Sequence, residues 1–167
     1  AQNVATVCCQ TPRALEGAFT SGYIERQSFE EVTGGTLVED GDHYSEAERK
    51  GELVRDLHPD EHATCYIVKG RGLVVISSCG HAGIVNTARQ AMEVSGVKKL
   101  HAALGGFHLF PAPDDYVRTT VAEFKALDPE VIIPMHCSGP TIVAMLRTEL
   151  ADRIITSSTG TEYVFGA

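Results

Sequence analysis

Three of the seven histidines lie at the same kind of place in the sequence, at or just past the end of an apolar run. His81 follows LVVISSCG, His108 follows LHAALGGF and His136 follows EVIIPM. Neutral imidazole nitrogens bind divalent metals, so three of them brought to one place would form a metal site. One histidine after a strand is more often a hydrogen-bonded surface residue, and it is the repetition that favours a ligand role.

The apolar runs themselves are predicted to be strands, because they are short, rich in β-branched residues and bounded by glycines. ATCYIVKGRGLVVISS predicts two strands joined by a tight turn at Lys69–Arg71, and KKLHAALGG predicts a third. EVIIPMH predicts another strand that runs into a histidine. RIITSS and TEYVF are predicted to be short final strands.

Segments with helical spacing of apolar residues separate these strands. AGIVNTARQAMEVSG predicts a helix capped by Gly96, and DDYVRTTVAEFKAL predicts a second helix. GPTIVAMLRTEL predicts a third, with Pro140 in its first turn. Strands that alternate with helices indicate an α/β layer structure. Strand ends in such a sheet line one edge, where ligands bind, and the glycines beside the histidines permit tight turns there.

The chain changes character near residue 60. Residues 1–60 include a polar stretch rich in glycine and glutamate, and they are predicted to form one or two strands with long loops. Residues 61–167 carry the regular strand and helix pattern. The two ranges are therefore predicted to be a loop-rich insert and a β/α unit.

The remaining histidines are predicted to have other roles. His101 lies inside a strand pattern and is expected to pack there. Three are expected to be mostly solvated: His43, His58 and His62. The acids of HPDEH, Asp60 and Glu61, are expected to form a turn and a strand entry.

Composition excludes several classes of partner. The net charge of −8 argues against nucleic acid and against an anionic membrane surface. No apolar stretch approaches the roughly 20 residues of a membrane span, and no signal peptide is visible. The five cysteines are odd in number and include the vicinal pair Cys8 and Cys9, which is a poor disulfide framework. Reduced thiols in a cytoplasmic protein are therefore expected.

A family resemblance is visible in three ordered segments. GLVVISSCGHAGIVNTARQA, KKLHAALGGFHL and VIIPMHCSG resemble the C-terminal half of the metallo-β-lactamase superfamily. The resemblance is strongest to the 7,8-dihydropterin-6-methyl-4-(β-D-ribofuranosyl)aminobenzene-5′-phosphate synthase-like branch, with a weaker similarity in TSGYIERQSFEE. It implies half of an αββα sandwich, with a mixed sheet that carries helices on one face and metals at the edge shared by the two halves.

The resemblance also implies roles for the three histidines. His81 stands where the family places the metal-binding histidine of its third motif, and His136 stands at the final metal-binding histidine. His108 falls near the position of the bridging aspartate of hydrolytic members and resembles a substitute for it. A divalent metal, zinc by preference, would lower the pKa of bound water and polarise a carbonyl or phosphoryl oxygen. β-Lactam hydrolysis is disfavoured by the change from carboxylate to imidazole.

One expected motif is absent. The superfamily signature His-x-His-x-Asp-His, which supplies most ligands of the first metal, does not occur in the sequence. A metal-dependent hydrolase-like protein is therefore expected to be active only if that half is supplied. Three explanations stay open: a piece of a longer protein, which the lack of an initiator Met favours, a subunit complemented by another chain, or a homo-oligomer. A non-catalytic interaction domain with a partial metal site is the alternative function.

A small anionic substrate is the expected ligand if the protein is active. Backbone amides near Gly105, Gly106 and Gly139 are candidates to contact it, since Gly139 opens a helix N-terminus. Ser138 is expected to cap that helix or to touch substrate, with the cap favoured. Arg26 is a candidate phosphate or carboxylate contact, although a solvated loop arginine is the commoner case.

Two cysteines flank the predicted ligands. Cys79 precedes His81 by two residues and Cys137 directly follows His136. They could bind a structural zinc with the histidines. However, adjacent residues leaving a strand point in opposite directions, so His136 and Cys137 are not expected to share a metal, and Cys137 is expected to be a buried small residue.

Overall fold

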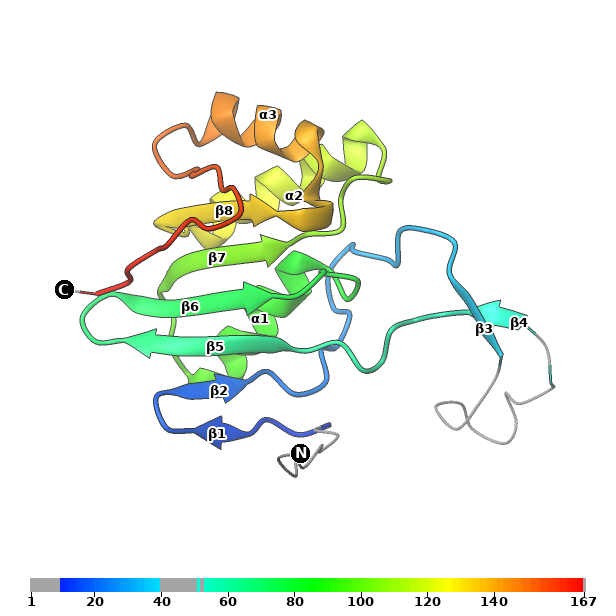
Figure 1. The fold of residues 1–167 in the computed structure, drawn as a ribbon, viewed down its shortest axis with the longest axis horizontal. Coiled ribbons are helices and arrows are strands. Elements are labelled where there is room, and N and C mark those ends of the chain that lie inside the picture. Colours follow the sequence, from blue (N-terminus) through cyan, green and yellow to red (C-terminus); the bar gives the residue numbers. More distant parts are fainter. Residues whose placement is uncertain (1–9, 40–50, 52, 167) are drawn as a thin grey trace.

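A six-stranded sheet organises the fold (Figure 1). The computed structural model describes residues 10–39, 51 and 53–166. The sheet has the order β1-β2-β5-β6-β7-β8, and β3 and β4 form a separate hairpin. The strands are β1 (Ala14–Leu15), β2 (Ala18–Thr20), β3 (Leu37–Glu39), β4 (Leu53–Arg55), β5 (Ala63–Val68), β6 (Gly72–Ser77), β7 (Leu100–Gly106) and β8 (Val131–Met135).

Three helices follow the three parallel strands in turn. They are α1 (Ile84–Ser95), α2 (Asp114–Leu127) and α3 (Pro140–Glu149), and a short 3₁₀ turn, η1 (His136–Ser138), precedes α3. All three predicted helices are confirmed. Gly96 ends α1 in the left-handed conformation and Pro140 occupies the first turn of α3, as the sequence indicates.

The direction of the strands decides where the histidines go. β6 pairs with β7 and β7 with β8 in parallel, whereas β5 runs antiparallel to β6. The C-terminal ends of β6, β7 and β8 therefore lie at one edge of the sheet, and so does the start of β5. The prediction of a common edge is confirmed, and Figure 1 shows the β3–β4 hairpin beyond that edge.

The core divides at the sheet. The larger cluster packs the helices against one face and includes Leu73, Val75, Val121, Phe124 and Leu146. Within residues 10–39, 51 and 53–166, no helix packs on the opposite face. A smaller cluster there is partly covered by the C-terminal segment, through two aromatic side chains, Tyr163 and Phe165. This is the mixed sheet with helices on one face that the sequence predicts.

The C-terminal strands are a wrong prediction. RIITSS makes only an isolated parallel bridge, Ile132 to Ile154, and TEYVF forms no strand. The reason is that residues 163 and 165 turn their rings onto the sheet face instead of extending its edge. Residues 1–60 contribute β1 and β2 to the main sheet and also β3 and β4. In the part of the chain that the structure describes, no helix has the length and apolar character to cross a membrane.

Candidate metal centre

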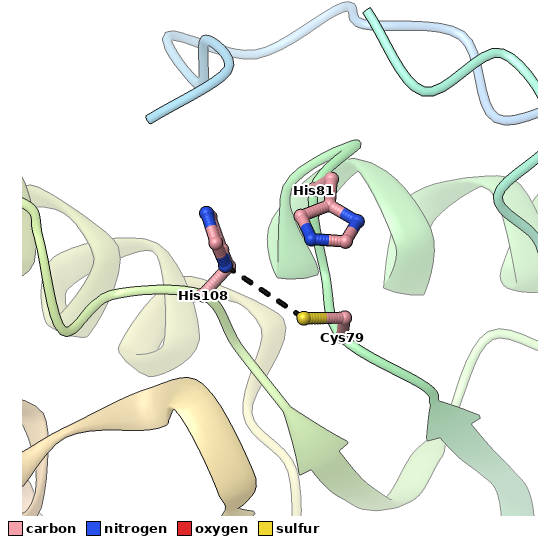
Figure 2. A group of neighbouring side chains, drawn as sticks. All are labelled: Cys79, His81 and His108. Carbon is pink, nitrogen blue, oxygen red and sulfur yellow. Dashed lines mark hydrogen bonds between the residues drawn. The ribbon is translucent and has the colours of Figure 1, made fainter. Parts of the chain in front are cut away.

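Two of the predicted ligands meet at a cysteine. Ligand atoms of Cys79, His81 and His108 all lie within 4.8 Å of one another; we call these residues the His81 cluster. Cys79 and His81 lie in the loop after β6, and His108 lies in the loop after β7. Figure 2 shows the two rings on either side of the Cys79 sulfur. The ring centroids of His81 and His108 are 4.4 Å apart.

The orientation of His108 is fixed from another segment. Its Nε2 donates to the carbonyl oxygen of Thr33 at 2.8 Å, and the Thr33 hydroxyl donates back to the His108 carbonyl at 2.9 Å. A carbonyl oxygen can only accept, so Nε2 carries the hydrogen in the neutral ring. The unprotonated Nδ1 then faces the Cys79 sulfur, at 3.7 Å. Outer contacts of this kind hold a histidine in the tautomer that binds metal.

Several residues at this edge of the sheet have a strained, left-handed backbone conformation. Among the described residues other than glycine, four have positive φ, and three of them are histidines of this edge: His58 (49°), His108 (47°) and His136 (49°). The fourth, Asp128, ends α2. A non-glycine residue in the left-handed region is uncommon, and such conformations cluster at functional sites.

Glu61 organises the loop that carries His81. Its carboxylate is buried and accepts hydrogen bonds from the amides of Gly80 (2.6 Å) and Ala82 (2.5 Å). One oxygen also lies 3.5 Å from Nδ1 of His81. The interpretation of Glu61 as only a strand entry is therefore wrong. β5 is antiparallel to β6, so the residues before Ala63 lie beside those after Ser77.

His58 is not solvated. Its ring stacks on that of His81, with centroids 4.0 Å apart and an interplanar angle of 18°. Asp56 lies 3.3 Å from its Nδ1 and also accepts from its backbone amide. The expectation of a solvated His58 is wrong, because the loop before β5 lies over the end of β6. His62 is exposed as expected, and His43 lies outside the described residues.

His101 lies at the opposite edge of the sheet. It is 7% exposed, and its Nδ1 lies 2.6 Å from the Glu130 carboxylate. The prediction that it packs within its strand is confirmed.

Electrostatics favour a neutral His81. Burial lowers the pKa of this imidazole, and the neighbouring His58 and His108 act in the same direction, against an opposing effect of Glu61. The neutral ring is the form that binds metal. Burial raises the pKa of Cys79 to about 12, with Cys137 adding to the effect. A metal ion would therefore have to displace the thiol proton.

Arg26 links the two loops that bear the stacked rings. Its guanidinium donates to the carbonyl of Leu57 at 2.5 Å and to that of His81 at 3.4 Å. It is partly buried, so a solvated loop arginine is a wrong interpretation. These contacts give Arg26 a positioning role, and a contact with substrate stays a prediction.

The same N-terminal segment caps α1. Glu30 is 3% exposed, and its two carboxylate oxygens accept from the amides of Val85 (3.1 Å) and Asn86 (2.8 Å). Gly83 leaves room for this approach, since a Cβ at that position would lie 2.2 Å from a Glu30 oxygen. A carboxylate at a helix N-terminus satisfies free amides and the helix dipole.

Glu30 predicts a pH dependence of stability. Burial raises its pKa above the ordinary 4.5. Its contribution is therefore fully present below about pH 4.5 and is lost as the pH rises through the raised value. The difference in free energy of unfolding between wild type and Glu30→Gln is expected to shrink from pH 4 upwards, measured by urea unfolding across the pH range. The exposed neighbour Glu31→Gln removes the same charge as a control; a difference that grows with pH for Glu30→Gln would contradict the assignment.

The residues predicted to contact an anion have packing roles. Gly105 and Gly106 are buried at the end of β7, against the backbone of Ser77 to Cys79. Ser138 is 2% exposed; its hydroxyl accepts from the Phe107 amide and donates to the Met135 carbonyl. The cap prediction for Ser138 is wrong, because Gly139 is the N-cap of α3 and carries no side chain. Anion contacts from these residues stay predictions.

His136 lies in a second group of ligand atoms. Cys79, His136 and Cys137 have ligand atoms within 4.8 Å of one another; we call these residues the thiol cluster. The expectation that His136 and Cys137 point apart is wrong, because the chain leaves β8 through η1 and not as an extended strand. The three predicted histidines thus surround Cys79 in two overlapping groups. Their role as ligands stays a prediction.

A polar pocket adjoins the His81 cluster. It has a volume of about 410 Å³ and is lined by His58, Glu61, Ser78 and His81 among others. It opens between the start of β5 and the loop after β6, so a ligand in it would contact the stacked histidine rings.

Comparisons with known proteins agree with this geometry. The chain is 33% identical over 127 residues to 7,8-dihydropterin-6-methyl-4-(β-D-ribofuranosyl)-aminobenzene-5′-phosphate synthase of Methanocaldococcus jannaschii, a match that covers 76% of this chain and 41% of that protein. It is also 33% identical over 119 residues to an uncharacterized protein of the same organism, covering 71% of this chain and 39% of that one. The chain thus spans about two fifths of the length of these relatives. No family model matches it.

A solved structure extends the similarity to the fold. Tm1679, described as a metal-dependent hydrolase of the β-lactamase superfamily, matches with a TM-score of 0.78 and 26% identity. The match covers 99% of this chain and 59% of that one. The resemblance predicted from the three sequence segments is confirmed. The chain is therefore similar in sequence to the dihydropterin phosphate synthase and similar in fold to a metal-dependent hydrolase of the β-lactamase superfamily.

Proposed function

We propose that this chain provides the metal-binding edge of a metal-dependent, hydrolase-like protein that acts on a small anionic substrate. The observation that carries the proposal is the His81 cluster, in which a thiol and two imidazoles from two separate loops converge. Activity requires the ligands of a His-x-His-x-Asp-His segment, from further chain or from another subunit. The chain's coverage of about two fifths of its relatives supports this requirement.

The donor set supports zinc. Sulfur and imidazole nitrogen are the ligands zinc prefers, and a site with three protein ligands leaves a position open for substrate. A divalent ion there would supply Lewis-acid polarisation of a substrate carbonyl or phosphoryl oxygen. Thr33 holds His108 in the tautomer that presents Nδ1. Glu61 and Arg26 hold the loop of His81 through its amides and its carbonyl.

Two observations support an anionic substrate. The related synthase is named for a 5′-phosphate compound. The N-terminus of α3 opens at this edge without a side-chain cap, and free helix amides favour anions.

The free thiols of Cys79 and Cys137, within reach of each other, support a reducing, cytoplasmic location.

Metal content of His81→Ala tests the proposal. The reduced chain is loaded with Zn²⁺, passed through a desalting column and measured by elemental analysis. We expect the variant to bind zinc at least about tenfold more weakly than wild type, because it loses one of three ligands. His101→Gln changes a histidine at the opposite edge of the sheet and serves as the control. Equal zinc affinity in wild type and His81→Ala would overturn the proposal.

The helix-free face favours a second candidate function, a non-catalytic interaction or oligomeric domain. A groove of about 580 Å³ crosses this face, lined by apolar side chains that include Tyr66, Ile67, Val74, Ile76 and Phe165. Tyr66 and Ile67 are 40% and 54% exposed. A complementing chain or a second copy would cover them. An oligomer on a sizing column, with no metal-dependent turnover after addition of the missing half, would favour this candidate.

A further inference from the structure

Two cysteines meet across a strand that separates them. Cys79 follows β6 and Cys137 follows β8, and β7 lies between these strands. Their sulfur atoms are nevertheless 3.1 Å apart, and Cys137 Sγ also lies 3.1 Å from the Cys79 carbonyl oxygen. Both cysteines are free thiols in the structure.

Gly106 leaves the space that lets the sulfur atoms of Cys79 and Cys137 come close. Gly106 ends β7 directly beneath the pair. A Cβ at this position would lie 2.8 Å from Cα of Cys79 and 3.1 Å from Sγ of Cys137. Any side chain there would force the two loops apart. Because Gly106 has no side chain, the loop that carries Cys79 and the loop that carries Cys137 can approach each other over the end of β7.

His136 completes the group. It begins η1 with φ at 49°, which turns the chain so that its ring and the next side chain both reach Cys79. His136 is exposed and the two thiols are partly buried, so an ion could enter from the side of His136. Two ligand atoms on a tetrahedral zinc, at about 2.1–2.3 Å from it, lie within about 4 Å of each other. The limit of 4.8 Å among the three ligand atoms is compatible with small adjustments toward that geometry.

We propose that the thiol cluster is a second metal site, which binds a thiophilic divalent ion such as zinc through two thiolates and one imidazole. On binding, each thiol loses its proton to solvent and forms a sulfur–metal bond, so two negative charges compensate the ion. Cys79 belongs to both clusters and would be a bridging thiolate when both sites are filled. The inference rests on the proposed function only for this bridging role, since the thiol cluster can bind metal by itself.

Cys79 is shared by the two clusters, and the clusters differ in the number of sulfur ligands. A thiolate of Cys79 shared by both clusters would bring the two ions close together at the sheet edge. The thiol cluster offers more sulfur than the His81 cluster, and sulfur selects softer ions. The two sites should therefore differ in metal preference, with the softer ion at the thiol cluster.

Cobalt absorption tests the inference on the reduced full chain. Co²⁺ bound by thiolate gives a charge-transfer band in the near ultraviolet, which imidazole and carboxylate ligands do not give. We expect wild type to bind about two ions and Cys137→Ser about one, with the band reduced by about half or more. Cys79→Ser should lose the band altogether. Cys65→Ala, which removes a core cysteine, is the control and should keep both the band and the stoichiometry.

The outcomes separate this inference from the proposed function. Loss of one ion in Cys137→Ser, with the other ion lost only in His81→Ala, supports both. Loss of the band in Cys137→Ser while His81→Ala binds like wild type supports the thiol cluster and overturns the His81 cluster. An unchanged band and stoichiometry in Cys137→Ser overturns the thiol cluster. So does a reduced chain without a thiolate band whose mass falls by two hydrogens on air oxidation, because the pair would then be a disulfide-forming couple only.

Discussion

Replacing Glu61 by Gln is expected to lower both stability and metal affinity. The carboxylate accepts from two backbone amides of the loop that carries His81, and one of its oxygens lies 3.5 Å from the ring. Glutamine has a single carbonyl oxygen, so its NH₂ group would face one of the amide donors. We expect the free energy of unfolding to fall by about 2 kcal/mol. Zinc affinity should fall by roughly 10- to 100-fold, since the outer contacts of a ligand loop are disturbed.

Two measurements on the same samples check this. Urea unfolding of the metal-free chain gives the stability change, and competition with a chelating indicator gives the zinc affinity. The neighbouring, exposed Asp60→Asn removes one carboxylate charge from the same loop and should change neither quantity. If Asp60→Asn and Glu61→Gln weaken zinc binding equally, the effect is general electrostatics and the positioning role of Glu61 is wrong.

The fold could be predicted from the sequence because its signals are local. The helix from Asp114 to Leu127 and the hairpin turn at Lys69–Arg71 are set by apolar spacing and by turn residues. The common edge of the histidines follows from the strand and helix order. The failed C-terminal strands show the limit, since TEYVF alternates like a strand and yet packs its rings on the sheet face.

The surroundings of the site were harder to predict, because they come from segments distant in sequence. Thr33 reaches His108 across 75 residues and Glu30 reaches α1 across 55. No local pattern marks such contacts. For Glu61 a signal did exist: the predicted antiparallel hairpin places the residues before its first strand beside those after its second. Topology alone could therefore have placed HPDEH beside SCGH, but the sequence interpretation did not use this signal.

The prediction that His136 and Cys137 point in opposite directions failed for a different reason. The alternation of side chains holds only while the backbone stays extended. His136 adopts a left-handed conformation at the start of a 3₁₀ turn, which no residue type in MHCSG requires. Strain of this kind is set by the surrounding structure and not by a local sequence pattern.

The largest loss of stability is expected from Gly105→Ala. Gly105 pairs with Ser77 in the parallel register of β6 and β7 and has φ at 114°. An added Cβ would lie 1.9 Å from the Ser77 carbonyl oxygen, a contact that only a backbone shift can relieve. The strained φ and the steric clash together should lower the free energy of unfolding by about 3 kcal/mol or more. The shift would also move Cys79, two residues beyond Ser77, so the zinc affinity should fall.

Gly70→Ala separates the clash from the strain. Gly70 lies in the turn between β5 and β6 with φ at 77°, and a Cβ there would meet nothing within 4 Å. The free energy of unfolding of Gly70→Ala should fall by only about 1 kcal/mol, because only the left-handed backbone is strained. This variant should bind zinc like wild type. Urea unfolding of the two variants beside wild type gives the comparison, and a Gly105→Ala chain that accumulates only as insoluble protein counts as the larger loss. Equal losses of unfolding free energy in the two variants would mean that β6 and β7 can move apart at low cost. The close approach at Gly105 would then not be what holds the loops of Cys79 and His108 together.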